Sequence, residues 1–85
     1  MTENEIFEFL KNVLTDYFEI DANKITMDAR LNEDLDVDSI DAIDMMSYIK
    51  KETGREIEPA QFKEVKTIRD IIDIIMKQMN NNENN

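Results

Sequence analysis

The sequence predicts an all-α fold: a small four-helix bundle of three longer helices and one short helix, with a long ordered loop between helices one and two. The chain has 85 residues, which suits one domain with a small core. It contains one Gly and one Pro, too few for the turns of an all-β protein. Apolar residues recur at helical spacing along three long segments.

The first helix is predicted to begin after Thr2, which forms a capping-box pattern with Glu5 ahead of an apolar run. A wide apolar stripe follows at helical spacing, formed by Ile6, Leu10, Val13 and Tyr17 on one face and by Phe7, Leu14 and Phe18 beside it. A stripe of this width predicts packing against two other helices.

The segment from Glu19 to Val37 has no helical period. Apolar anchors nevertheless occur in it at irregular intervals, at Ile20, Ile25, Met27, Leu31 and Leu35. Loops of this length are uncommon in compact domains unless they are functional or packed by their own side chains. We therefore expect this loop to be ordered.

The second helix is predicted from Ser39 to Thr53, with Asp38 as N-cap, Asp41 at the third helical position and Gly54 as the left-handed terminator. The residues expected to face the core are Ile40, Ile43, Met46 and Ile49. Those expected on largely exposed faces are Asp41, Asp44, Lys51 and Glu52.

A short helix is predicted from Pro59 to Glu64, anchored by Phe62 and Val65, because proline suits the first position of a helix. Thr67 and Asp70 repeat the cap pattern before a last helix with the apolar stripe Ile68, Ile71, Ile72, Ile75 and Met79. Residues 1–79 should form the helical domain, and the Asn-rich residues 80–85 should be a disordered tail.

Composition excludes several classes of chemistry. The chain has no Cys and no His, so disulfides, thiolate metal sites and Ser-His pairs are absent. The apolar runs are short and the N-terminus lacks a signal-peptide plan, which favours a cytoplasmic protein without stable membrane insertion. We expect a monomer.

The net charge is −10, and it is unevenly distributed. Residues 1–44 hold 13 acids and 3 bases, whereas residues 45–85 hold 7 of each. This distribution argues against nucleic acid or anionic lipid as a partner and favours a basic protein surface. A purely solubilising role of the charge is the alternative.

Ser39 lies in the most acidic part of the chain. From Leu31 to Asp44 there are six acids and no Lys, Arg or His, so nothing nearby can take the hydroxyl proton or hold an oxyanion. We predict no catalytic residue, and we interpret Ser39 as a residue on which another enzyme acts. A helix-start serine without further role is the alternative.

Alternating carboxylates at Asp34, Asp36 and Asp38 are similar to the opening of an EF-hand calcium loop. The later positions do not fit, because Ser39 occupies the glycine position and Met45 occupies the position of the bidentate glutamate. We therefore predict no metal site.

The motif around the serine has a specific spacing: Asp34-Leu35, three spacer residues, then Ser39-Ile40, with Asp38 before the serine. This pattern resembles the signature of the acyl carrier proteins. The likeness extends from the first helix to the last and covers almost all of the chain except the Asn-rich tail. It implies an acyl-carrier-like helical domain.

The resemblance implies that Ser39 receives a 4′-phosphopantetheine arm from coenzyme A through a phosphopantetheinyl transferase, and that acyl groups are carried on the arm as thioesters. The chain would then deliver acyl intermediates between enzymes of fatty-acid or related lipid or polyketide synthesis, without being an enzyme itself. The residues expected to meet basic docking patches on acyl-loading and acyl-processing enzymes are Asp36, Asp38, Asp41 and Asp44.

Three departures from the family pattern leave the pathway open between housekeeping fatty-acid synthesis and a specialised route. Asp36 stands where a glycine is common, and Lys50 and Lys51 replace glutamates. Thr53 and Arg55 flank Gly54 where apolar residues are frequent.

Four methionines on the helices expected to border an acyl pocket, Met45, Met46, Met76 and Met79, are interpreted first as core filling and second as an adaptable pocket lining. Two other functions compete with acyl carriage. One is an acidic helical adaptor that binds a basic protein without modification, and the other is a divalent-ion sensor.

Overall fold

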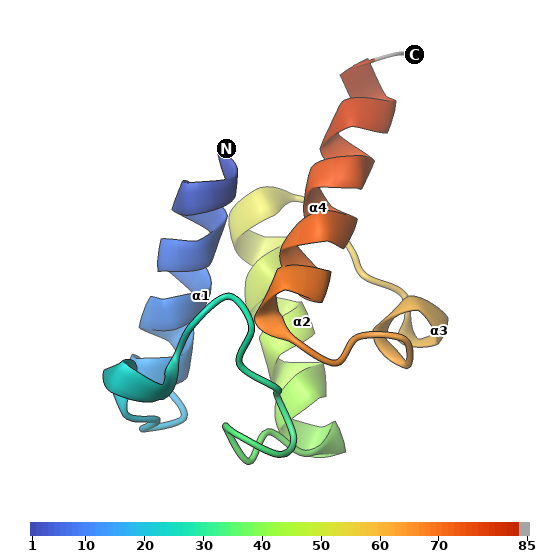
Figure 1. Cartoon of the computed structure of the whole chain (residues 1–85). Coiled ribbons are helices and arrows are strands. Elements are labelled where there is room, and N and C mark those ends of the chain that lie inside the picture. Colours follow the sequence, from blue (N-terminus) through green and yellow to red (C-terminus); the bar gives the residue numbers. More distant parts are fainter. Residues whose placement is uncertain (84–85) are drawn as a thin grey trace.

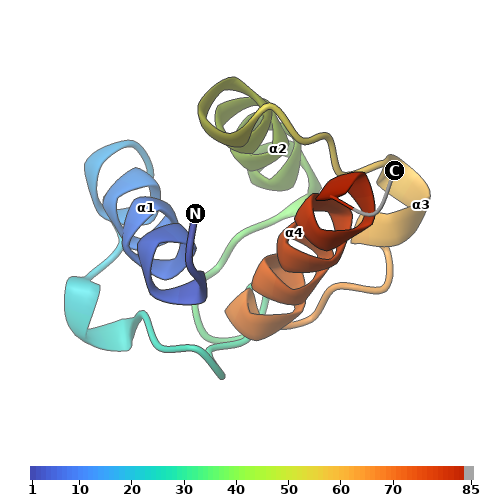
Figure 2. The same cartoon turned by 90° about the horizontal axis from the view of Figure 1, so that it is seen from above.

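The computed structural model describes the backbone of residues 1–83 and the side chains of residues 1–79. Its helices in the described range are α1 (Glu3–Asp16), α2 (Ser39–Thr53), α3 (Pro59–Phe62) and α4 (Ile68–Glu83). Helices α1, α2 and α4 surround one core, α1 runs opposite to the other two, and α3 lies beside α4 outside this group (Figure 1, Figure 2). The predicted all-α class and four-helix plan are confirmed.

The helix starts are fixed by reciprocal side-chain caps. At α1, the Thr2 hydroxyl oxygen accepts the Glu5 N–H at 3.2 Å, and the Glu5 carboxylate accepts the Thr2 N–H at 2.8 Å. At α4, the Thr67 hydroxyl oxygen accepts the Asp70 N–H at 3.3 Å, and the Asp70 carboxylate accepts the Thr67 N–H at 3.0 Å. Both predicted caps are confirmed.

The core is apolar and is shared by the long helices and the long connection. Its helical part consists of Ile6, Leu10 and Leu14 of α1, Met45 and Ile49 of α2, and Ile68, Ile71, Ile72 and Ile75 of α4. None of the described polar or charged residues is buried. Among the described helices, none has the length and hydropathy that a membrane-spanning segment requires.

The connection between α1 and α2 is ordered, as predicted. It contains one 3-10 turn (Ala22–Lys24) and buries Ile25, Ala29, Leu31, Leu35 and Val37 in the core. Backbone hydrogen bonds tie it to the start of α4, since the Leu31 N–H donates to the Lys66 carbonyl at 2.9 Å and the Arg69 N–H donates to the Met27 carbonyl at 2.8 Å. The connection is therefore held by both apolar burial and backbone pairing.

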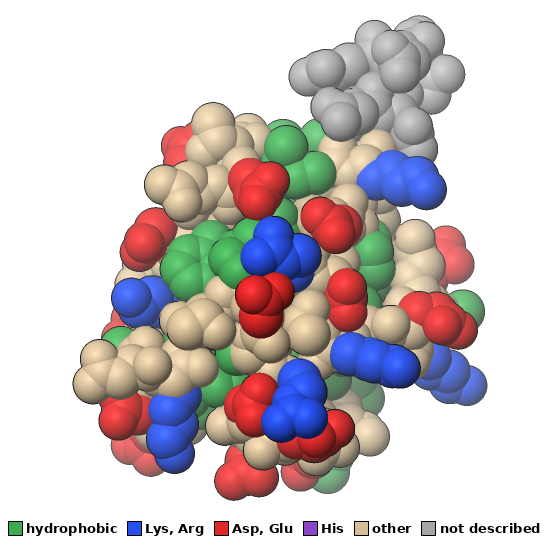
Figure 3. Space-filling model, in the orientation of Figure 1, with side chains coloured by type: hydrophobic (Ala, Val, Ile, Leu, Met, Phe, Trp, Pro, Cys, Tyr) green, Lys and Arg blue, Asp and Glu red, His purple; other side chains and the backbone are tan. Residues whose placement is uncertain are grey.

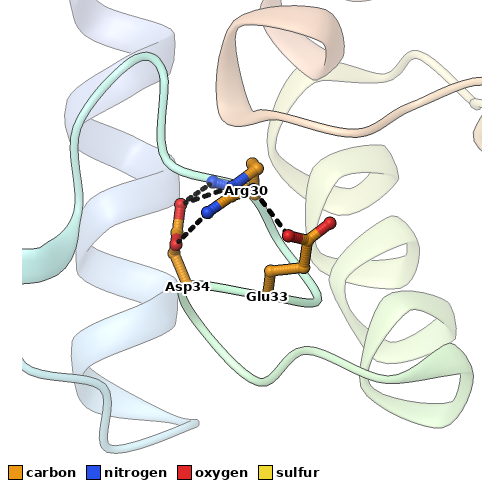
Figure 4. A network of polar contacts seen from close by, with 3 residues as sticks. All are labelled: Arg30, Glu33 and Asp34. Carbon is orange, nitrogen blue, oxygen red and sulfur yellow. Dashed lines mark hydrogen bonds and ion pairs between the residues drawn. The ribbon is translucent and has the colours of Figure 1, made fainter.

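Arg30 organises the turn before α2 (Figure 4). The Asp34 carboxylate accepts the Arg30 backbone N–H at 2.8 Å and two guanidinium N–H groups at 3.2 Å, while Glu33 binds another guanidinium nitrogen. The guanidinium hydrogen bonds, followed by the backbone hydrogen bond, hold the pKa of Asp34 below its ordinary value. We call these three residues the Arg30 network.

The predicted core face of α2 is wrong at two positions. Ile40 and Ile43 were expected in the core, yet their exposed fractions are 72% and 58%. The buried residues of α2 are Ala42, Met45 and Ile49. Both sets have helical spacing, so the sequence contains two apolar stripes on α2, and only packing selects one of them. Met46 is partly buried, in agreement with its expected direction.

Other differences occur at element ends. Tyr17 was expected on the buried face of the first helix but is 62% exposed, because α1 has already ended at Asp16; its ring instead stacks on Tyr48 of α2 at 4.5 Å between centroids. Helix α3 ends at Phe62 and not at Glu64.

Helix α4 extends past residue 79, where the helical domain was expected to end. The backbone of α4 continues helically to Glu83, four residues past that limit. Residues 84–85 and the side chains of residues 80–83 lie outside the described part. The expected disorder of the Asn-rich tail (residues 80–85) therefore stays a prediction.

Replacing Ile49 by Ala should lower the free energy of unfolding by about 2–5 kcal/mol, because the side chain is fully buried and its removal leaves a cavity. The matched change Ile43→Ala, on the same helix but 58% exposed, should cost less than about 1 kcal/mol. Urea denaturation followed by circular dichroism measures both. Equal losses would contradict the observed rotation of α2.

The Arg30 network should make stability depend on pH. Since the pKa of Asp34 is lowered in the folded state, its stabilisation is present above about pH 4 and is lost as the pH falls through the folded-state pKa. The melting temperature of the parent should therefore exceed that of Asp34→Asn at neutral pH, and the difference should shrink below about pH 3. Asp44→Asn is the control. A parent-to-variant difference that is independent of pH would contradict this assignment.

Candidate functional site

Ser39 is the first residue of α2, and its position is set by the cap next to it. The Asp38 carboxylate accepts the Asp41 N–H at 2.9 Å, and the Asp41 carboxylate accepts the Asp38 N–H at 3.5 Å. The Gly54 backbone is left-handed (φ 72°) and closes the other end of α2. The predicted start, cap and end of this helix are all confirmed.

The Ser39 side chain is exposed and chemically passive. Within the described residues, its hydroxyl makes no hydrogen bond, and the N–H groups of Ser39 and Ile40 find no acceptor. No histidine exists in the chain to act as its base. The site thus offers a free hydroxyl and two free amide hydrogens at the positive end of a helix.

The four acidic candidates do not all border the same hollow. Asp36 and Asp41 line the same hollow of about 430 Å³, Asp38 lines a different cavity, and Asp44 lines neither. In the described residues, no group of three or more acidic, Cys or His side chains is arranged to hold a metal ion. The structure brings only Asp38 and Asp41 into direct mutual contact.

Asp36 occupies the position where family members commonly have glycine, and its backbone adopts a conformation that glycine favours. Its φ is 56°, in the left-handed region that glycine adopts freely and that Asp tolerates better than most residues. Its backbone N–H donates to the Asn32 carbonyl at 3.2 Å. The turn into α2 therefore has a glycine-like conformation although it lacks the glycine.

Lys50 and Lys51 have a local structural role at the end of α2. Lys50 forms an ion pair with Glu56 of the following segment at 3.5 Å, and both residues are exposed. Lysines in the last turn of a helix also interact favourably with its negative dipole end. This accounts for their presence without reference to a partner.

A cavity of about 700 Å³ opens beside Ser39, between the start of α2, the connection and the α3 region. Its apolar lining consists of Leu31, Val37, Ala42, Ile43, Met46, Pro59, Phe62 and Val65. Its polar lining consists of Arg30, Asn32, Glu33, Asp38, Ser39, Lys63 and Lys66. The serine hydroxyl is therefore on the rim of a largely apolar hollow.

The sequence indicated only part of this lining. Of the four methionines considered, Met46 lines the cavity, Met45 is fully buried in the core, and Met76 and Met79 are partly buried elsewhere. Besides Arg30, which was not selected as a site residue, the cations of the lining are Lys63 and Lys66, which were not selected either. Their only signal in the sequence is the spacing of two lysines around Val65, which would not by itself indicate a cavity.

Comparison with known proteins agrees with this geometry. Residues 8–75 match the family model described as a phosphopantetheine attachment site. The chain is 44% identical over 72 residues to acyl carrier protein 2 of Ralstonia nicotianae, covering 85% of this chain and 89% of that protein. It is 36% identical over 75 residues to the acyl carrier protein of Coprothermobacter proteolyticus, covering 88% and 92% of the two chains.

A third relative extends the match along the chain. The acyl carrier protein of Petrotoga mobilis is 30% identical over 80 residues, which is 94% of each protein. The region matched by the family model includes all of α2 and α3, parts of α1 and α4, and Ser39. The chain therefore belongs to the acyl carrier protein family: it is a carrier and not an enzyme, it bears acyl groups on covalently attached 4′-phosphopantetheine, and it interacts with acyl-processing enzymes.

Proposed function

We propose that Ser39 is the attachment site of the 4′-phosphopantetheine arm, and that the chain carries acyl intermediates between enzymes of fatty-acid or related lipid or polyketide synthesis in the cytoplasm. The observation that supports this most directly is the exposed Ser39 hydroxyl at the start of α2, on the rim of an apolar cavity. A serine without a base suits a residue that another enzyme modifies.

The residues around Ser39 fit a phosphodiester. The free N–H groups of Ser39 and Ile40 can donate to an anion at the positive end of the α2 dipole. The interaction of an anion with the helix dipole there is worth about 0.3–1 kcal/mol. The Asp38 and Asp41 carboxylates are engaged with each other's backbone amides. When bound, the arm supplies a terminal thiol for thioester formation, which a chain without Cys cannot supply itself.

The cavity beside Ser39 suits the apolar part of an acyl chain. Its volume of about 700 Å³ lies within the range of small-molecule sites. Phe62 and Val65 on one side and Met46 on the other provide apolar walls. Burial of an acyl chain there would remove its apolar surface from water while the cargo is carried between enzymes.

The acidic start of α2 suits contacts with basic partners, including a phosphopantetheinyl transferase. Asp36, Asp38 and Asp44 are exposed, and Asp41 is partly exposed. Long-range attraction between such charges and a basic patch accelerates encounter more than it strengthens binding. This behaviour suits a carrier that must leave each enzyme after one step.

Attachment at Ser39 is tested by intact-mass measurement. The protein is incubated with coenzyme A and a phosphopantetheinyl transferase, and we expect the mass gain of one arm. Ser39→Ala should abolish the gain completely. Ser47→Ala is the matched control, because Ser47 is the other serine of the chain and is exposed on the same helix. An undiminished gain in Ser39→Ala would contradict the attachment site.

The same measurement bears on the adaptor hypothesis. If several transferases add no mass to the parent protein, unmodified binding of a basic partner becomes the better account of the acidic surface. A gain that is lost only in Ser39→Ala supports carriage.

Docking by the α2 carboxylates is tested by transferase kinetics. Asp44→Asn should lower kcat/KM for arm transfer about two- to fivefold at low salt, because it removes one steering charge near Ser39. The loss should largely disappear at about 0.5 M salt. Asp73→Asn removes an exposed carboxylate from α4 instead and serves as control. Equal losses in both variants would indicate that net charge alone matters.

A further inference from the structure

The cavity beside Ser39 differs in charge from the rest of the molecule. Its charged lining contains three cations, Arg30, Lys63 and Lys66, and two carboxylates, Glu33 and Asp38, so its net charge is +1. The whole chain has a net charge of −10. Cations thus outnumber carboxylates in this lining, whereas the whole chain has 20 acidic and 10 basic residues.

Two other hollows show the contrast. The hollow that contains Asp36 and Asp41 is lined by five carboxylates and one lysine, and a hollow beside α4 is lined by three carboxylates and Lys77. Both linings are net negative. In Figure 3 blue side chains lie at the lower right, on the side where Figure 1 places α3, and other blue side chains are spread over the rest of the view.

The three cations of the cavity are not equally available. Arg30 is neutralised by Glu33 and Asp34 in the Arg30 network. Lys66 lies close enough to Asp70 to interact with its charge. Lys63 forms no ion pair with any carboxylate of the described side chains. Lys63 is therefore the cation most able to accept a new anionic partner.

Lys63 also stands next to the apolar part of the lining. It follows Phe62 at the end of α3, and both residues border the cavity. A lysine can lay its aliphatic stem along an apolar surface and keep its ammonium group in water. The lining thus combines an apolar wall with an exposed lysine.

We propose that this cavity favours acyl chains that end in a carboxylate, with the methylene segment against the apolar wall and the terminal carboxylate paired with Lys63, assisted by Lys66. This inference rests on the proposed attachment of the arm at Ser39. The cargo class is the monothioesters of dicarboxylic acids whose methylene segment is long enough to lie along this wall, such as the adipoyl group. The phosphate of the arm is a second anion that Lys63 could meet, and it is common to every cargo.

The test compares two cargoes of equal carbon number on the same arm. The protein is loaded with hexanoyl or adipoyl arms from the corresponding coenzyme A thioesters, and loading is confirmed by mass. We expect the adipoyl form to melt about 2–4 °C above the hexanoyl form at low salt, the size expected for a partly exposed ion pair in a small domain. The difference should vanish at about 0.5 M salt.

Matched variants locate the effect. Lys63→Gln should abolish or reverse the adipoyl advantage, and Lys63→Arg should retain it. Lys77→Gln removes one positive charge from α4, away from this cavity, and should leave the advantage unchanged. As a second readout, the amide resonance of Lys63 should shift more on adipoyl than on hexanoyl loading.

The outcomes separate this inference from the attachment itself. Successful loading with equal melting temperatures for the two cargoes would overturn the cargo preference and leave Ser39 as attachment site. An equal effect of Lys63→Gln on both cargoes would assign Lys63 to the arm's phosphate and would likewise overturn the preference. Failure of any loading at Ser39 would overturn both proposals.

Discussion

The rotation of α2 about its own axis is the constraint on which the functional arrangement depends. Burial of Ala42, Met45 and Ile49 fixes this rotation, because these side chains complete the core formed with α1 and α4. The opposite side of the helix is then exposed, including Ile40 and Asp44. Ile43 and Met46 consequently border the cavity, and the serine at the helix start lies on its rim.

The long connection between α1 and α2 holds the start of α2, and with it Ser39, beside the cavity. Its apolar anchors Ile25, Leu31 and Leu35 are buried, and Ile20 and Met27 are partly buried. Its backbone pairs with the start of α4, and the Arg30 network holds the turn before the helix. Asp36 adopts a left-handed conformation within that turn. Segments distant in sequence, the connection and the α3 region, thereby form two walls of the cavity beside Ser39.

Charge is divided unevenly between surfaces of the protein. Carboxylates are frequent around the start of α2, and in our proposal their negative field guides a basic partner. The cavity lining has the opposite sign, and its cations come largely from the half of the chain whose charges sum to zero. Lys50 and Lys51 belong to neither surface, since the helix end and Glu56 account for them.

Local signals in the sequence determined the helix starts, the end of α2 and the position of Ser39, because caps and a left-handed glycine involve residues only a few positions apart. The motif around Ser39 also determined the family. Only the tertiary structure decided which apolar stripe of α2 is buried, because the exposed pair Ile40 and Ile43 has the same helical spacing as the buried residues of this helix. The cavity and its cations were decided in the same way, since residues from α2, the connection and the α3 region meet only when the chain is folded.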